Sequence, residues 1–231
     1  MASIIAFISQ TGNVMKTTLT AAVGLSLAAA GNKVAAYDLD LEHFMLGASL
    51  KTWLDDRAIR QKELVQLACR YWPSAAAALA DAATRPADEI ILIDCPSRAT
   101  AATAAIVAAA AFVVIPQVPG DKDLKLIERR LAELIAGGAD ATRMAILMTR
   151  TRSPVEVRDF QLLLKANPGL ADIAILGASV PEQVGYRKAL AKGLAITEAA
   201  PESIARTART AVDALIEAYL VATEADAAAP P

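Results

Sequence analysis

The sequence has few of the residues that several common functions require. Aromatic residues make up only 4% of its 231 residues, so it is a poor candidate for a protein that stacks the bases of single-stranded nucleic acid. Its two cysteines, Cys69 and Cys95, stand far apart and form no CxxC pattern, which offers neither a disulfide framework nor a metal site. His43 is the only histidine, so a histidine-based metal site is excluded.

The sequence also lacks a surplus of positive charge and a membrane signal. Lysine and arginine number 23 against 25 aspartates and glutamates, for a net charge of −2, so a nucleic-acid partner would need a local basic patch. No basic region precedes the first apolar run, as a signal peptide would require. The longest apolar stretch, residues 99–115, contains threonines and ends at Pro116, which argues against a membrane span. We expect a cytoplasmic protein.

Buried-strand patterns alternate with helical patterns along the whole chain, whose residues are 55% hydrophobic. Continuous apolar runs rich in β-branched residues are typical of strands buried on both faces. The predicted strands are residues 3–8, 34–37, 89–93, 112–115, 144–148 and 173–176. Residues 41–85 are predicted to be mostly helical, with helices at residues 61–71 and 74–83. The other predicted helices are residues 17–30, 100–110, 121–136, 154–166, 182–191 and 202–221. This alternation predicts an α/β fold with a doubly wound, mostly parallel sheet. We expect one domain over residues 1–222 and a flexible acidic tail over residues 223–231.

A polar loop at residues 10–18 joins the first predicted strand to the first predicted helix. Free backbone N–H groups and the helix dipole favour a phosphate at this place. Lys16 could reach the β- and γ-phosphates of a nucleotide, and the hydroxyl of Thr17 could bind Mg²⁺. The pattern GxxxxGK[ST] is not met, because Met15 stands at the last glycine. On the loop alone, a plain strand–turn–helix with a solvated lysine is the alternative.

Two aspartates at the ends of other predicted strands support the nucleotide interpretation. Asp94 ends an apolar strand, where a Walker B aspartate would hold Mg²⁺ through water. Asp38 ends another strand, where it could bind the metal or orient an attacking water. Three matching positions at three strand ends are hard to obtain by chance. We therefore predict a P-loop NTPase with Lys16 and Asp38 as catalytic residues.

Several segments together resemble the ParA/MinD family of deviant Walker A ATPases. ISQTGNVMKTTL resembles the family loop ISQKGGVGKTTL, YDLDLE its DxDPQ segment, and LIDCPS its IDTPP-type Walker B. FVVIPQVPGDKDL resembles its strand–proline segment, and VPEQVGYRKALAKGLAITE its ending. The resemblance covers residues 2–220 and is closest to small plasmid-partition ParA proteins.

The resemblance implies a SIMIBI-type P-loop fold that binds ATP and Mg²⁺, forms a nucleotide-dependent homodimer and acts with a partition or adaptor protein. The nucleotide-binding residues it implies are Gly12, Asn13, Val14, Met15, Lys16, Thr17 and Thr18. The implied metal-binding residues are Thr17, Asp38 and Asp94.

Three departures from the family loop predict slow or absent hydrolysis. Thr11 replaces the signature lysine that reaches the partner subunit's phosphates, and such a cation contributes on the order of 10³–10⁵ in rate in related phosphoryl transfer. Asn13 replaces a glycine but tolerates positive φ. Met15 replaces another glycine, and its Cβ should hinder close approach to phosphate. Lys122 or Arg150 could supply the missing charge.

Basic residues near the end of the chain are the candidates for DNA contact. The resemblance implies non-specific DNA binding there, which needs only lysine and arginine against phosphates; a solvated helix face is the alternative. The candidates are Arg187, Lys188, Lys192, Arg206 and Arg209. The terminal helix has no basic face of the kind an interfacial anchor needs, so we predict no membrane association.

Three functions remain open from the sequence. The first is a ParA-like ATPase for plasmid or DNA partition or positioning, favoured by Lys16, Thr17 and the two aspartates. The second is an impaired nucleotide-binding or pseudo-ATPase adaptor that acts on DNA or on a partner protein, favoured by Thr11 and Met15. The third, an ATP-dependent small-molecule enzyme, is disfavoured because no further acid–base cluster is visible.

Overall fold

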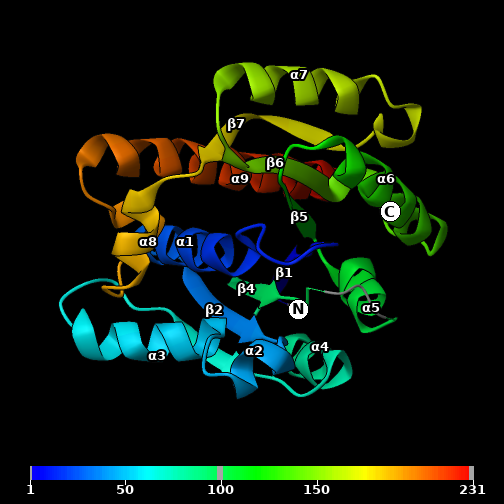
Figure 1. Ribbon diagram of the computed structural model, residues 1–231. Helices are drawn as coiled ribbons and strands as arrows, with labels where there is room; N and C mark the ends of the chain where they lie inside the picture. The colour runs from blue at the N-terminus through cyan, green and yellow to red at the C-terminus, as the bar shows by residue number, and fades with distance from the viewer. Residues whose placement is uncertain (1, 98–100, 229–231) are drawn as a thin grey trace.

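The chain folds around one seven-stranded sheet in which every pairing is parallel. The computed structural model describes residues 2–97 and 101–228, without the side chains of residues 44, 121–123 and 225–228 (Figure 1). The strand order is β3-β2-β4-β1-β5-β6-β7. The strands are β1 (Ser3–Phe7), β2 (Lys33–Asp38), β3 (Ala68–Tyr71), β4 (Glu89–Asp94), β5 (Phe112–Gln117), β6 (Met144–Thr151) and β7 (Ala174–Pro181). The predicted doubly wound fold is confirmed.

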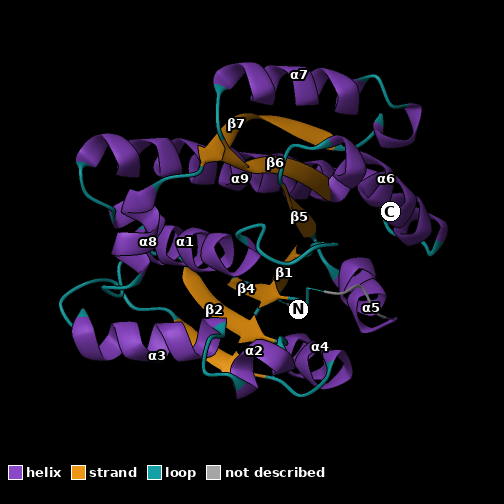
Figure 2. Ribbon diagram, viewed as in Figure 1, coloured by secondary structure: helices purple, strands orange, loops and turns teal. Residues whose placement is uncertain are grey.

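Helices cover both faces of this sheet (Figure 2). They are α1 (Lys16–Ala29), α2 (Leu41–Met45), α3 (Leu50–Arg60), α4 (Ala75–Thr84), α5 (Ala101–Ala109), α6 (Asp121–Ala136), α7 (Pro154–Lys165), α8 (Val184–Leu190) and α9 (Glu202–Ala228). Short 3-10 turns lie at η1 (Ala141–Arg143), η2 (Pro168–Leu170) and η3 (Ile196–Glu198).

The central strand shows why both faces are covered. Ile4 and Ala6 of β1 enter a core shared with α4, α5, α6 and α7. Ile5 and Phe7 enter the opposite core, which α1, α8 and α9 close. Since successive side chains of a strand point to opposite faces, an uninterrupted apolar run needs a helical layer on each side.

One predicted helix is wrong. Residues 61–71 form a loop followed by the edge strand β3, which pairs with β2 from Ala35↔Ala68 to Asp38↔Tyr71. The helix of this region is instead α3, which starts at Ser49, whose side chain accepts a hydrogen bond from the N–H of Thr52. Leu67 anchors the loop in a small core with α1 and α3. A Cβ on Gly24 of α1 would collide with the Leu67 side chain, so the missing side chain makes room for this packing.

Other boundaries differ at the ends of elements. β6 continues past residue 148 to Thr151, and β7 continues to Pro181, so both reach the edge of the sheet where ligands bind in such folds. The last helix was expected to end at residue 221 but continues to Ala228; residues 229–231 of the expected tail lie outside the described residues. Within the described part of the chain, no helix is long and apolar enough to cross a membrane.

Candidate phosphate-loop site

A cavity of about 390 Å³ opens at the carboxyl ends of the strands, over the loop between β1 and α1. Its volume is in the range of small-ligand sites. Six of the seven predicted nucleotide-binding residues line it, and these are Asn13, Val14, Met15, Lys16, Thr17 and Thr18. Gly12 lies in the same loop, with open space where a Cβ would stand. The loop therefore forms part of the cavity wall.

Lys16, Thr17 and Asp94 meet beneath this loop. The Nζ of Lys16 lies 2.5 Å from Oδ1 of Asp94, and both side chains are buried, at 4% and 1% exposure. The hydroxyl of Thr17 donates to Oδ2 of the same carboxylate over 2.6 Å. The sequence predicted a phosphate role for Lys16 and metal roles for Thr17 and Asp94, and in the structure these three side chains are in contact.

Burial and charge act in opposite directions on this pair. Burial is the largest influence on Lys16 and favours its neutral form, but the adjacent Asp94 outweighs it and the pKa of Lys16 is raised. Burial likewise raises the pKa of the Asp94 carboxyl, against the opposing effects of Lys16 and Thr17. An ammonium, a hydroxyl and a carboxylate thus lie together beneath the loop, and these are groups that bind phosphate oxygens and Mg²⁺.

Asp38 lies apart from the cavity wall. It is fully buried, and its two carboxylate oxygens accept the backbone N–H groups of Asp40 at 3.1 Å and Lys51 at 2.9 Å. Asp40 lines the cavity instead, where its carboxylate lies 2.9 Å from Nδ1 of His43. Asp38 therefore holds the segment that presents Asp40, and the Asp-Leu-Asp spacing is the sequence signal that points to this second aspartate.

The loop keeps a left-handed backbone at both positions where this chain replaces a glycine of the resembled family. Asn13 has φ 65° and Met15 has φ 66°. For a residue with a Cβ this conformation costs on the order of 1–2 kcal/mol, so other contacts have to hold it. Among the described residues, the one further non-glycine residue with positive φ is Arg150, at 52°, and it lines the same cavity.

The end of β6 braces this strained loop. The hydroxyl of Thr149 donates to the carbonyl of Val14 at 3.0 Å, and the guanidinium of Arg150 donates to the carbonyl of Asn13 at 3.1 Å. Arg150 also forms an ion pair with Glu182 at 2.8 Å, which holds the pKa of that glutamate below its usual range. Arg150 thus lies at the cavity as expected of a compensating cation, with its guanidinium bonded within the chain. Lys122, the other candidate, has no described side chain.

The opposite wall comes from the end of β7 and from α8. It consists of Pro181, Glu182, Gln183, Tyr186, Arg187 and Leu190. Tyr186 is buried and its hydroxyl donates to the carbonyl of Ile204 at 3.2 Å, and burial raises its pKa to about 12. These residues belong to the segment VPEQVGYRKAL, which resembles the family ending, but none of them was predicted at the nucleotide, and Arg187 was expected to contact DNA.

The predicted DNA-contacting residues do not behave as one set. Lys188, Lys192 and Arg206 are exposed, whereas Arg187 also borders the cavity. Arg209 is half-buried and donates to the carbonyl of Thr197 at 2.7 Å and to the carboxylate of Glu202. Three of the five side chains are therefore exposed and clear of the cavity, and Arg209 is bonded within the chain.

The donor set tests whether Mg²⁺ fits here. In the described part of the chain, no group of three or more acidic, histidine or cysteine side chains could enclose a metal ion. A hydroxyl and a carboxylate, from Thr17 and Asp94, suit a Mg²⁺ that keeps several waters and is shared with phosphates. The residues fit a metal that arrives with a polyphosphate.

Comparisons with known proteins agree with this geometry. A family model described as the CobQ/CobB/MinD/ParA nucleotide binding domain matches residues 5–196. The MinD cell division protein of Aquifex aeolicus shares the fold with a TM-score of 0.66 at 19% identity, over 100% of this chain and 99% of that chain. No curated protein sequence matches significantly.

Two further solved structures carry nucleotides. A septum site-determining MinD protein of Pyrococcus horikoshii, complexed with Mg-ADP, has a TM-score of 0.63 at 19% identity, over 94% and 95% of the two chains. A Borrelia burgdorferi protein assigned to plasmid partition, bound to AMPPNP, has a TM-score of 0.62 at 14% identity, over 95% and 98%. At these identities the likeness is one of fold.

Proposed function

This chain belongs to the CobQ/CobB/MinD/ParA family of nucleotide-binding domains, and from that premise we propose that it is a ParA-like ATPase for plasmid or DNA partition or positioning. In this proposal it binds ATP with Mg²⁺ at the phosphate-loop cavity and hydrolyses it slowly. It forms a nucleotide-dependent homodimer, binds DNA without sequence preference and acts with a partition or adaptor protein.

One observation carries the proposal: Lys16, Thr17 and Asp94 converge beneath a loop whose backbone keeps the glycine-like conformation. The N-terminus of α1 supplies free N–H groups and a positive dipole end to a phosphate on that loop. Lys16 would bind the β- and γ-phosphates. Thr17 and Asp94 would hold Mg²⁺, which neutralises phosphate charge when bound.

Slow hydrolysis follows from what borders the cavity. Thr11 lines it where the resembled family carries a lysine, so the loop brings no second cation to the transition state. Arg150 and Arg187 also line the cavity, but the guanidinium of Arg150 is shared between Asn13 and Glu182. The site as built supports binding better than turnover.

Calorimetry with ATP and Mg²⁺ tests the proposal. The wild-type protein should bind, and Lys16→Ala should abolish or greatly weaken binding. Lys33→Ala is a matched control, because Lys33 forms an exposed pair with Asp88 at the start of β2; it should leave the affinity unchanged. Absence of binding by the wild type, or equal binding by Lys16→Ala, would refute a working nucleotide site.

A second function, a nucleotide-binding adaptor without hydrolysis, is favoured by Thr11 and by the position of Asp38. Asp38 is bonded to two backbone N–H groups away from the cavity wall, which removes it from an attacking water. Single-turnover hydrolysis separates the two functions. The variant Thr11→Lys, Asn13→Gly, Met15→Gly should raise turnover and ATP-dependent dimerisation by light scattering. No product from the wild type over many hours would favour the adaptor.

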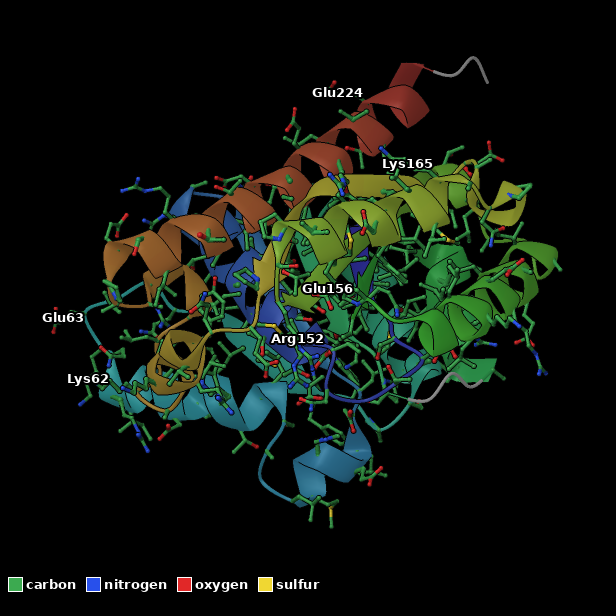
Figure 3. All side chains as sticks on the ribbon, turned by 45° about the horizontal axis from the view of Figure 1, so that its top comes forward. Lys62, Glu63, Arg152, Glu156, Lys165 and Glu224 are labelled. Atoms are coloured by element: carbon green, nitrogen blue, oxygen red, sulfur yellow. The ribbon has the colours of Figure 1, made fainter. Side chains whose placement is uncertain are left out.

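DNA binding is tested at the exposed cations alone. Lys188→Glu with Lys192→Glu should weaken the retardation of any duplex and flatten its dependence on salt. Lys165→Glu is the control, since Lys165 is exposed at the end of α7 (Figure 3). If all of these proteins retard DNA equally, Lys188 and Lys192 are not part of a DNA site.

A further inference from the structure

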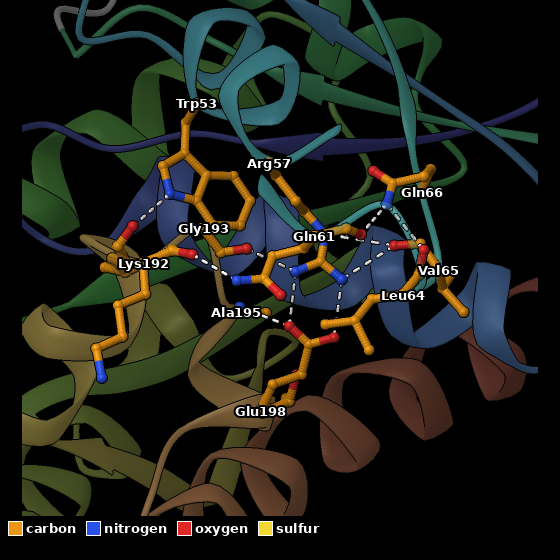
Figure 4. Close-up of polar contacts among 12 residues, drawn as sticks. Trp53, Arg57, Gln61, Leu64, Val65, Gln66, Lys192, Gly193, Ala195 and Glu198 are labelled. Atoms are coloured by element: carbon orange, nitrogen blue, oxygen red, sulfur yellow. Dashed lines mark hydrogen bonds and ion pairs between the residues drawn. The ribbon is translucent and has the colours of Figure 1, made fainter. Parts of the chain in front are cut away.

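Four consecutive carbonyl groups, that of the last residue of α8 and those of the three residues after it, accept hydrogen bonds from side chains of α3 and its cap residue. Figure 4 shows the bonds donated by Trp53, Arg57 and Gln61. The bonds run from Trp53 to Leu190 at 3.0 Å, from Arg60 to Ala191 at 3.0 Å, from Gln61 to Lys192 at 2.9 Å and from Arg57 to Gly193 at 2.7 Å.

Arg57 is the buried member of this set. It is fully inaccessible to solvent, and besides Gly193 it binds both carboxylate oxygens of Glu198 at 2.7 and 2.8 Å. Its remaining N–H groups donate to the carbonyl of Val65 at 3.3 and 3.0 Å. All five donors of the guanidinium are therefore used, which a lysine could not reproduce.

The backbone of Gly193 fits closely over this arginine. Its φ is +74°, and a Cβ there would lie 3.3 Å from the Cα of Arg57. A left-handed residue in contact with a buried guanidinium fixes where the chain leaves α8. The position of α8 thus depends on Arg57 at its C-terminal end.

The same short helix forms part of the wall of the cavity that the phosphate loop also lines. Tyr186, Arg187 and Leu190 of α8 border the cavity. Since the loop at Lys16 lines the same cavity, a ligand with its phosphates on the loop has this wall available for its remaining part. The other end of α3 is tied to the site as well, because the N–H of Lys51 holds Asp38.

We infer that Arg57 is a positioning residue for the nucleoside side of the cavity, acting through α8 and never touching the ligand. This inference rests on the proposed nucleotide binding. An apolar side chain of similar volume could fill the space at least as stably, because buried ion pairs contribute little net stability. The five hydrogen bonds of the Arg57 guanidinium fix the position of α8, which an apolar contact would not do.

The test compares two ligands on Arg57→Lys and on the milder Glu198→Gln in the full chain. Tripolyphosphate with Mg²⁺ probes the phosphate loop alone, and ADP with Mg²⁺ probes both walls. We expect the dissociation constant for ADP to rise about tenfold, the lower end of the range for residues that orient the ligands of metal sites, while that for tripolyphosphate stays unchanged. Arg129→Lys, at an exposed pair with Glu133 on α6, should change neither.

Hydrogen exchange gives a readout that needs no ligand. Amides of α8 should exchange faster in Arg57→Lys, while those of β1 and β4 keep their protection. Equal weakening of both ligands, or unchanged exchange in α8, would overturn the inference. If the wild type binds neither ligand, the proposed function fails on its own. The exchange of α8 then decides alone: faster exchange supports the positioning role of Arg57, and unchanged exchange overturns it.

Discussion

Replacing Asp94 with asparagine removes the charge partner of Lys16 while keeping the shape of the side chain. In the protein without nucleotide, Nζ of Lys16 is 2.5 Å from this carboxylate and only 4% of the lysine side chain is exposed. The ammonium would remain buried beside a neutral amide. That amide offers the hydroxyl of Thr17 one acceptor oxygen, where the carboxylate offers two. Breaking a buried pair from one side costs about 3–5 kcal/mol, so we expect that loss in the free energy of unfolding.

Urea unfolding measures this loss. With a slope of about 3 kcal/mol per molar for a chain of this size, the midpoint should fall by about 1–2 M. Lys16→Met should destabilise the protein by a similar amount, since it leaves the buried carboxylate of Asp94 without its charge partner. The double variant should be much more stable than the sum of the two losses predicts, because neither charge is then left alone.

The control is the exposed pair of Lys33 and Asp88, whose side chains are 69% and 62% exposed. Asp88→Asn should leave the midpoint almost unchanged. Strictly additive losses in the double variant, or a midpoint for Asp94→Asn equal to that of the wild type, would show that Lys16 and Asp94 do not stabilise one another in solution.

Thr149→Val should lower the free energy of unfolding by about 1–2 kcal/mol, because the carbonyl of Val14 loses its hydrogen-bond partner, and it should weaken ATP binding. Thr149→Ser keeps the hydroxyl and should have neither effect. If serine behaves like valine, the hydrogen bond to Val14 does not stabilise the loop. Met15→Gly should tighten ATP binding while stability changes by no more than ~1 kcal/mol, since relief of left-handed strain and greater chain entropy oppose each other; calorimetry and urea unfolding check it. Burial raises the pKa of Cys95 to about 12, so at pH 8 only about one thiol in ten thousand is ionised. Burial raises the pKa of Cys69 as well. A thiol reagent should therefore react slowly with the native protein and rapidly with two thiols after denaturation, and a fast native reaction would contradict this.

The sequence predicts well the elements whose burial is two-sided. β1, β4 and β5 read as uninterrupted apolar runs because helices cover both of their faces, so their pattern alone identifies them. β3 is different, since it lies at an edge of the sheet and only Cys69 and Tyr71 of its residues are half-buried. Its strand conformation comes from pairing with β2, which no local pattern in residues 61–71 reveals.

The residues of the site also differ in whether the sequence predicts them. Lys16, Thr17 and Asp94 are predictable because a loop motif and a strand end mark them. The cavity wall at Tyr186 and Leu190 is not, because it depends on how far β7 extends and on the contacts that place α8. Those contacts join residues more than a hundred positions apart in the chain, and their partners are mostly backbone carbonyls, which carry no sequence signature.

Gly24 shows how an absent side chain can determine a distant element. Its backbone is not left-handed, so its torsion angles do not require a glycine. The constraint is spatial, because a Cβ would meet Leu67 ahead of the edge strand. Even an alanine at position 24 would force the end of the Leu67 side chain to move. The helix that begins at the phosphate loop therefore leaves room for the apolar side chain that directly precedes the edge strand.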